Sequence, residues 1–348
     1  MNPFRPIVSK AELTRWPIVV LRYLRRPAVG WLVKAVLLGW VLCYLWQSLE
    51  TQLSTLAALQ ARWQAGLTPL AWGLVVIVAG LLPVNWGLEA LKWQGLARKM
   101  EQVSFGKAFV GVLTGLALGL ATPNRLGEYA GRIGQMHGRH RLRTIGAVWL
   151  GRFVQLYVTL LAGSLALLFY AGSRLPGSFF LALGGLLLLG NGALAGVLLA
   201  RRPLLAIGLR QRRLRPIRPY VTILRRYSDR DLSVLLGLAT LRYGVFSLQF
   251  GVLLYLFGVR LPVGEVLSGI ALVFLSKSLF PSLTFLADLG VREAAAVFFF
   301  GNFGAQAPPV VAASLVLWLL NLLLPALLGA FFILQLRLSS ETSASFQE

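Results

Sequence analysis

The chain has 348 residues, of which 57% are hydrophobic and 13% charged, and its mean hydropathy is +0.72. So large an apolar fraction excludes a soluble globular protein and indicates a polytopic membrane protein. The formal net charge is +22, and most of the basic residues lie in short segments between hydrophobic runs, which is typical of membrane topology signals and argues against a nucleic-acid-binding domain.

A basic lead, residues 1–27, precedes the first hydrophobic run. No small-residue cleavage pattern follows it, so we expect the lead to remain attached and to lie in the cytoplasm. Six hydrophobic runs have the length of about 20 residues that crosses a bilayer. They cover residues 28–48, 67–91, 145–171, 178–200, 232–258 and 310–336.

Two further hydrophobic runs, residues 108–121 and 266–276, are too short to cross. Each leads directly into a charged, glycine-containing motif. Such lengths are typical of re-entrant or buried half-helices. We therefore predict two re-entrant helical hairpins, at about 106–136 and about 264–302.

The distribution of basic residues favours the hairpins. If the first short run crossed the membrane, the basic segment 139–143 would lie outside, against the positive-inside rule. A hairpin keeps that segment in the cytoplasm and also places the arginine-rich loop 201–230 and both termini there. The alternative, in which both short runs cross, gives eight spans and a poorer charge fit.

Residues 28–171 and 172–336 then have the same order of span, span, hairpin and span, in opposite orientations. The sequence thus predicts an all-α polytopic membrane protein with about six full transmembrane helices and two re-entrant hairpins in an inverted-topology repeat. A polar tail, 337–348, follows. Inverted repeats of this kind supply two related conformations around a site near the membrane midplane.

The two motifs concentrate ionisable residues at membrane depth, where such groups need a partner, a water-filled cavity or a substrate. The candidate substrate-binding residues are Arg125, Glu128, Arg132, Arg242, Asp288, Arg292 and Glu293. The candidate backbone-shaping residues, expected to break helices, turn the chain and free amides for a phosphate or carboxylate, are Pro123, Asn124, Gly127, Pro281 and Gly290. The alternative is that Arg and Glu pair with each other to hold each hairpin without a ligand.

Other charged residues in the spans admit different interpretations. Arg152 and Lys277 fit either a cavity or a lipid-facing position. Glu89 and Lys92 lie near the end of a predicted span, where extension toward the headgroups is the cheaper solution, and Trp93 fits an interfacial belt.

The sequence predicts neither a metal site nor a cofactor. Cys43 is the single cysteine, and His137 and His140 lie among arginines that repel a cation. Without a nucleotide-binding P-loop, a transporter would depend on a gradient, the membrane potential or downhill exchange.

We expect no enzymatic activity. Two functions are alternatives to a transporter. One is a membrane-embedded transferase that acts on a phospholipid or polyprenyl carrier, with Glu128 or Asp288 as base, and the other is a membrane assembly partner.

The motif TPNRLGE at 122–128 resembles the signature TPGR(I/L)GE, and DLGVRE at 288–293 resembles the end of GGLGVxE. Both signatures belong to the integral-membrane, flippase-like region of lysylphosphatidylglycerol synthases (multiple peptide resistance factors) and of stand-alone relatives. The chain departs from the pattern at Asn124 and Asp288, where the family has glycine.

The resemblance implies a fold with two re-entrant helices and a role in moving lipids between leaflets, in a bacterial inner membrane. It does not imply aminoacylation, because the synthases carry that activity on a soluble C-terminal domain, whereas this chain ends about a dozen residues after the last predicted span. The expected partners are a membrane phospholipid or lipid-linked substrate and anionic lipid at the basic loops, without nucleic acid. Association into a homo-oligomer is left open.

Overall fold

The computed structural model describes Val36, Gly39 and residues 68–333, except for several short gaps. The gaps are 121, 123–124, 135, 137–139, 173, 209–217 and 280–284, and the side chains of 140–142, 208, 219 and 285–289 are also outside the description. The first predicted span, 28–48, lies almost wholly outside the described residues.

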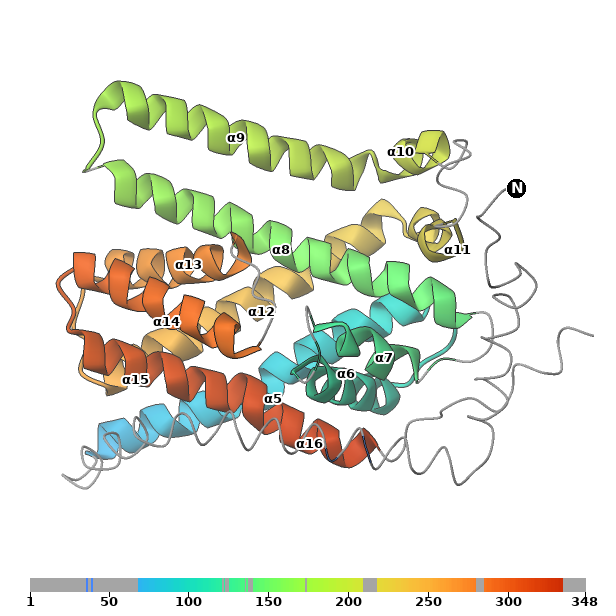
Figure 1. The fold of residues 1–348 in the computed structure, drawn as a ribbon, viewed down its shortest axis with the longest axis horizontal. Helices are drawn as coiled ribbons and strands as arrows, with labels where there is room; N and C mark the ends of the chain where they lie inside the picture. Colours follow the sequence, from blue (N-terminus) through green and yellow to red (C-terminus); the bar gives the residue numbers. More distant parts are fainter. Residues whose placement is uncertain are drawn as a thin grey trace, which may run out of the picture.

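Five long helical stretches form the framework of the described part (Figure 1). They are α5 (Pro69–Ala97), α8 (His140–Gly172), α9 (Gly177–Leu199), α12 (Asp229–Leu256) and α15 (Ala307–Trp318), which continues through the π-helical segment η4 (Leu319–Leu323) into α16 (Leu324–Phe332). All five are long and apolar enough to cross a membrane. They confirm the predicted spans from 67–91 onward, with differences of up to six residues at the helix ends, and the chain is a multi-pass membrane protein.

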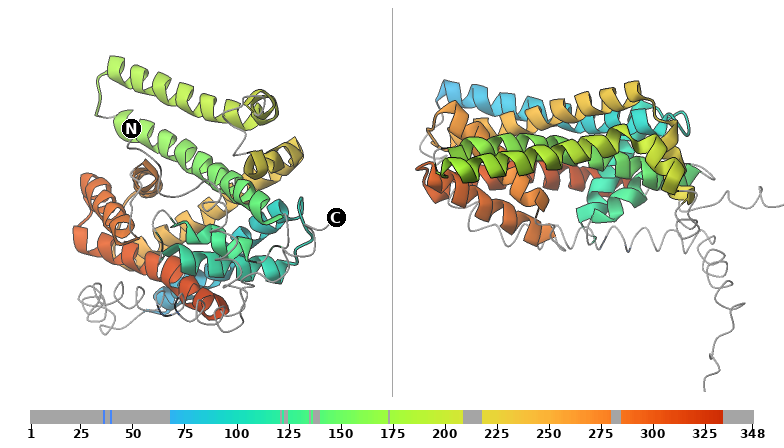
Figure 2. Two further views of the ribbon diagram at one scale, coloured as in Figure 1. Left: turned by 45° about the vertical axis from the view of Figure 1, so that its right-hand side comes forward. Right: turned by 90° about the horizontal axis from the view of Figure 1, so that it is seen from above.

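Short helices α10 (Arg201–Gly208) and α11 (Arg218–Val221), with the 3-10 helix η3 (Thr222–Arg226), join α9 to α12. Helix α9 lies beside α8 at the edge of the bundle (Figures 1 and 2). Only Leu198 on it is buried. Its apolar surface therefore faces outward, as expected for a helix in contact with lipid.

The two short runs form helical pairs that turn back on themselves. The first hairpin consists of α6 (Phe105–Leu120) and α7 (Gly127–Ile133), and the second of α13 (Val263–Leu279) and α14 (Phe285–Asn302). In Figure 1 the two hairpins lie toward opposite ends of the long helices. This arrangement agrees with the predicted turns, while the position of each hairpin relative to a bilayer stays a prediction.

Glycines allow the two helices of the first hairpin to touch. A Cβ atom on Gly131 would overlap the backbone of Gly115, and one on Gly127 would overlap the backbone of Leu118. These pairings run in opposite directions along the two helices, so α6 and α7 are antiparallel. Helix α16 approaches α6 equally closely, since a Cβ on Gly329 would overlap a carbonyl of that helix.

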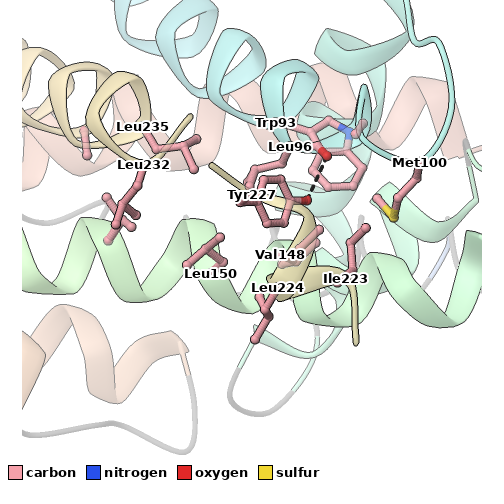
Figure 3. Packing of buried hydrophobic residues seen from close by; sticks show 14 of the residues in the cluster. Trp93, Leu96, Met100, Val148, Leu150, Ile223, Leu224, Tyr227, Leu232 and Leu235 are labelled. Carbon is pink, nitrogen blue, oxygen red and sulfur yellow. Dashed lines mark hydrogen bonds between the residues drawn. The ribbon is translucent and has the colours of Figure 1, made fainter. Parts of the chain in front are cut away.

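Tyr227 connects the segment after the basic loop to the end of α5 (Figure 3). It is completely buried, and its hydroxyl donates a hydrogen bond to the Leu96 carbonyl at 2.8 Å. Leu96 lies in the last turn of α5, where carbonyls lack helical partners. Burial raises the pKa of the Tyr227 phenol above its ordinary value, so the phenol remains a neutral donor.

Substituting Tyr227→Phe should lower the free energy of unfolding by about 1 kcal/mol, because the ring still packs while the buried carbonyl loses its donor. Thermal unfolding in detergent, followed by tryptophan fluorescence, measures the change. Tyr255→Phe, at an exposed ring, is the matched control. Equal midpoints for Tyr227→Phe and wild type would show that the bond contributes nothing.

Candidate functional site

A cavity of about 590 Å³ lies between the two hairpins and the helices α5, α8 and α12. The first hairpin contributes Arg125, Glu128 and Arg132 to its wall, and the second contributes Lys277 and Arg292. The two motifs, far apart in the sequence, therefore share a single cavity. This volume lies within the range of small-molecule sites.

The wall of the cavity is strongly basic. Its described lining includes seven basic and two acidic side chains, a formal excess of five positive charges. The basic ones are Lys92, Arg125, Arg132, Arg152, Arg242, Lys277 and Arg292, and the acidic ones are Glu89 and Glu128. The side chain of Asp288 lies outside the described residues.

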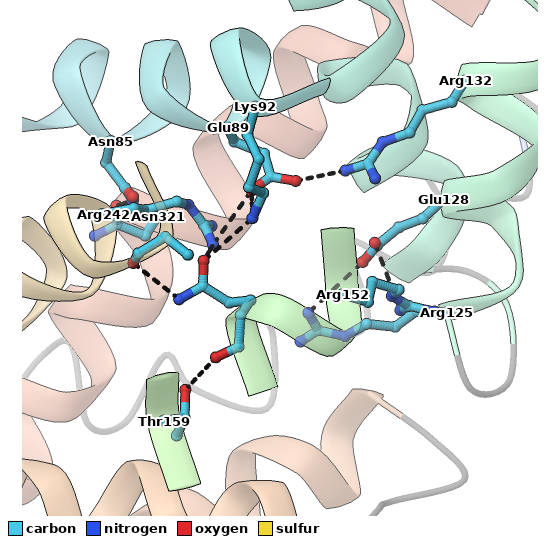
Figure 4. A network of polar contacts seen from close by, with 12 residues as sticks. Asn85, Glu89, Lys92, Arg125, Glu128, Arg132, Arg152, Thr159, Arg242 and Asn321 are labelled. Atoms are coloured by element: carbon cyan, nitrogen blue, oxygen red, sulfur yellow. Dashed lines mark hydrogen bonds and ion pairs between the residues drawn. The ribbon is translucent and has the colours of Figure 1, made fainter. Parts of the chain in front are cut away.

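The carboxylate of Glu89 on α5 forms ion pairs with three of the basic side chains (Figure 4). Its carboxylate lies 2.7 Å from Lys92 Nζ, 2.7 Å from Arg132 Nη2 and 3.5 Å from Arg242 Nη1. The Gln155 side-chain oxygen accepts hydrogen bonds from Lys92 at 3.1 Å and from Arg242 at 3.4 Å. This Glu89 cluster joins α5 to the first hairpin, α8 and α12.

Glu128 on α7 forms the centre of a second, looser cluster (Figure 4). The nearest nitrogens of Arg152 and Arg125 lie 3.5 Å and 3.8 Å from its carboxylate. Arg152 also lies over the ring of Tyr129, 5.2 Å from its centre. Because both distances exceed the 2.7 Å at which Lys92 and Arg132 lie from Glu89, the carboxylate of the Glu128 cluster holds its arginines less tightly than Glu89 holds those two cations.

Thr122 organises the turn between α6 and α7. Its hydroxyl donates to the Leu118 carbonyl at 2.8 Å and accepts from the Gly127 amide at 2.7 Å. Arg125, within the same turn, has a φ of 55°, a conformation uncommon for residues other than glycine and often found at functional sites. The turn therefore fixes the backbone from which Arg125 and Glu128 reach the cavity.

The expected backbone roles need correction at two glycines. The amide of Gly127 is bound by Thr122 and is not free for a ligand, and this glycine serves the close packing of α7 on α6. Gly290 does not turn the chain, because it lies inside α14, several residues after the helix begins. Pro123, Asn124 and Pro281 lie outside the described residues.

Asn321 enters the cavity wall from the π-helical segment η4. It accepts a hydrogen bond from the side chain of Asn85 on α5. Pro325 lies four residues further on, and since proline has no N–H, the Asn321 carbonyl loses its regular helical donor there. This explains a local change in helical pitch, and such π-bulges frequently occur at functional sites.

On the second hairpin, Arg292 is buried, and its Nε donates to the Ser314 hydroxyl at 3.0 Å. Glu293, half-buried on the same helix, is not among the described residues that line the cavity. The structure thus brings together five of the seven predicted binding residues. They are Arg125, Glu128, Arg132, Arg242 and Arg292.

The interpretation of Glu89, Lys92 and Trp93 as interfacial residues was wrong. Lys92 is 3% exposed and Trp93 1%, because α5 continues to Ala97 and buries both inside the bundle. Arg132 stacks over the Trp93 ring at 5.6 Å. One feature of the sequence could have indicated that these residues pair inside the bundle. Glu89 and Lys92 are oppositely charged and lie three residues apart on one helix.

Comparison with protein families matches residues 28–329 to the model described as "Lysylphosphatidylglycerol synthase TM region". Neither the curated proteins nor the solved structures yield a match. The match covers most of the chain, including both motifs, and confirms the resemblance found in the sequence. Because the family model matches residues 28–329, this chain of bundled helices, two hairpins and a shared cavity belongs to the family of the lysylphosphatidylglycerol synthase transmembrane region.

Proposed function

We propose that this protein binds the anionic headgroup of a membrane lipid in the cavity and moves that lipid between the leaflets. The observation that carries the proposal is the formal excess of five positive charges among the described residues that line a cavity shared by two hairpins. Charges at membrane depth are costly unless they meet a partner or a substrate. Arginine is suited to phosphate, because its planar guanidinium can donate two parallel hydrogen bonds.

A lipid, as opposed to a soluble anion, is favoured by the apolar rim of the cavity. Trp149 and Leu156 on α8 line the cavity and are also 46% and 37% exposed. Trp149 stacks on Phe153, another lining residue, with ring centres 5.1 Å apart. The cavity therefore opens toward the apolar outer surface. A headgroup could occupy it while the acyl chains stay in the bilayer beside α8.

Alternating access would come from the predicted inverted repeat. If the hairpins enter the membrane from opposite sides, with both termini in the cytoplasm of a bacterial cell, rocking of the two halves would open the cavity to each leaflet in turn. In this proposal the lipid is moved without covalent change. A gradient, the membrane potential or downhill exchange would supply the driving force.

The test is a leaflet-resolved lipid assay in proteoliposomes made with phosphate-bearing lipid. Arg242→Gln should slow translocation at least about tenfold, because Arg242 is partly exposed in the cavity and a hydrogen bond to a charged group is worth about 1.5–3 kcal/mol. Arg230→Gln, at an exposed position outside the cavity lining, should leave the rate unchanged.

Equal translocation rates for wild type and Arg242→Gln would show that the cavity takes no part in the mechanism. Lipid extracted after the assay should be chemically unaltered. A covalently modified product would replace the translocase with a membrane-embedded transferase.

A further inference from the structure

We infer that the headgroup bound in this cavity carries at least two negative charges, as in a lipid phosphomonoester or diphosphate. This inference rests on the proposed function and narrows its substrate class. It disfavours zwitterionic headgroups and headgroups that carry an added amino acid.

The charge excess is built into two separate groups of side chains. Around Glu89, three cations surround one carboxylate and leave a formal charge of +2. Around Glu128, two arginines leave a formal charge of +1. Lys277 and Arg292 add further positive charge from the second hairpin. Cationic groups thus lie on more than one wall of the cavity.

Three arginines keep part of their surface accessible. The side chains of Arg125, Arg152 and Arg242 are 28%, 33% and 29% exposed, whereas those of Lys92 and Arg132 are almost fully buried. The accessible three belong to the turn before α7, to α8 and to α12. They would contact the ligand directly, while the two buried cations strengthen the positive field behind them.

Charge matching then selects the headgroup. A phosphodiester such as phosphatidylglycerol carries one negative charge and would balance only one of the five formal positive charges in excess among the described lining residues. A phosphomonoester carries about −1.5 to −2 at neutral pH, and a second phosphate adds more. A zwitterionic or aminoacylated headgroup would bring a further cation among like charges, which raises the energy of the complex.

The experiment compares lipids with matched acyl chains and different headgroups, added to the purified full-length protein. Binding is followed by the thermal shift in detergent, and translocation by the leaflet-resolved assay. Phosphatidic acid and a polyprenyl diphosphate should each bind at least tenfold more tightly than phosphatidylglycerol. Phosphatidylethanolamine and lysyl-phosphatidylglycerol should bind more weakly still.

Two variants connect this preference to the cavity. Arg152→Gln should reduce the preference for phosphatidic acid over phosphatidylglycerol severalfold, whereas Arg152→Lys, which retains the charge, should preserve most of it. Arg230→Gln controls for attraction of anionic lipid to the protein surface.

Equal affinity for phosphatidic acid and phosphatidylglycerol, or an unchanged preference in Arg152→Gln, would overturn the inference. Either result would leave the proposed function intact if phosphatidylglycerol is translocated. Conversely, a strong preference for phosphomonoesters without translocation of any lipid would overturn the proposed function and leave the headgroup assignment standing.

Discussion

Replacing Gly131 with alanine should destabilise the protein by about 3 kcal/mol, at the upper end of the cost of overpacking. The new methyl group would overlap the backbone of Gly115 on α6. A backbone cannot rotate away as a flexible side chain can, so α7 must separate from α6. Since α7 carries Glu128 and Arg132, this separation should also abolish lipid translocation.

Gly290→Ala is the matched control, because it makes the same change inside a helix of the second hairpin. Among the described residues, no neighbouring heavy atom lies within 4 Å of the added Cβ. The alanine should therefore stabilise α14 by up to about 1 kcal/mol through its higher helix propensity. Thermal unfolding in detergent measures both variants. Midpoints that move in the same direction by similar amounts would contradict close contact between α6 and α7.

The second large effect is expected for Glu89→Gln. The glutamine keeps the shape of the side chain but removes the carboxylate that holds Lys92, Arg132 and Arg242. Breaking a buried charge pair typically costs about 3–5 kcal/mol, because the remaining partner is left uncompensated. We expect a loss of about 3 kcal/mol in the free energy of unfolding.

Lipid should reverse part of this loss. If the cavity binds phosphate, an added phosphate-bearing lipid replaces the missing negative charge and should raise the unfolding midpoint of Glu89→Gln more than that of wild type. A merely structural carboxylate would not produce this difference. Glu265→Gln, in the first turn of α13 and outside the cavity lining, should show the same lipid response as wild type.

The framework could be predicted from the sequence because it follows from length. The five long apolar runs from 67–91 onward became α5, α8, α9, α12 and the α15–α16 stretch, and the two short runs became the first helices of the hairpins. These features depend on local composition, which a single sequence displays directly.

Some cavity residues could not be predicted from the sequence, because their positions depend on where a helix ends and on how the helices pack. Hydropathy ends the second span at residue 91, but α5 continues to Ala97, and this difference converts Lys92 from an interfacial residue into a buried one. Asn321 is a single polar residue in an apolar run, and only its pairing with Asn85 reveals its place. Partners on other helices decide both positions.

The electrostatic character of the site also emerges only in three dimensions. The motifs show acids and bases in similar numbers, which suggested mutual pairing as much as a ligand. From outside the motifs, the cavity adds four basic residues and one acidic residue, while Glu293 does not line it. The basic residues are Lys92, Arg152, Arg242 and Lys277, and the acidic one is Glu89. Long-range packing thus produces a charge excess that neither motif shows by itself.

The most direct test is a density map of the protein in lipid nanodiscs that contain a phosphate-bearing lipid. We predict density for a phosphate group among Arg125, Arg152 and Arg242, with acyl chains passing Trp149 on α8. A cavity without lipid density, in a map that resolves headgroups only around the outer surface of the bundle, would contradict headgroup binding between the hairpins.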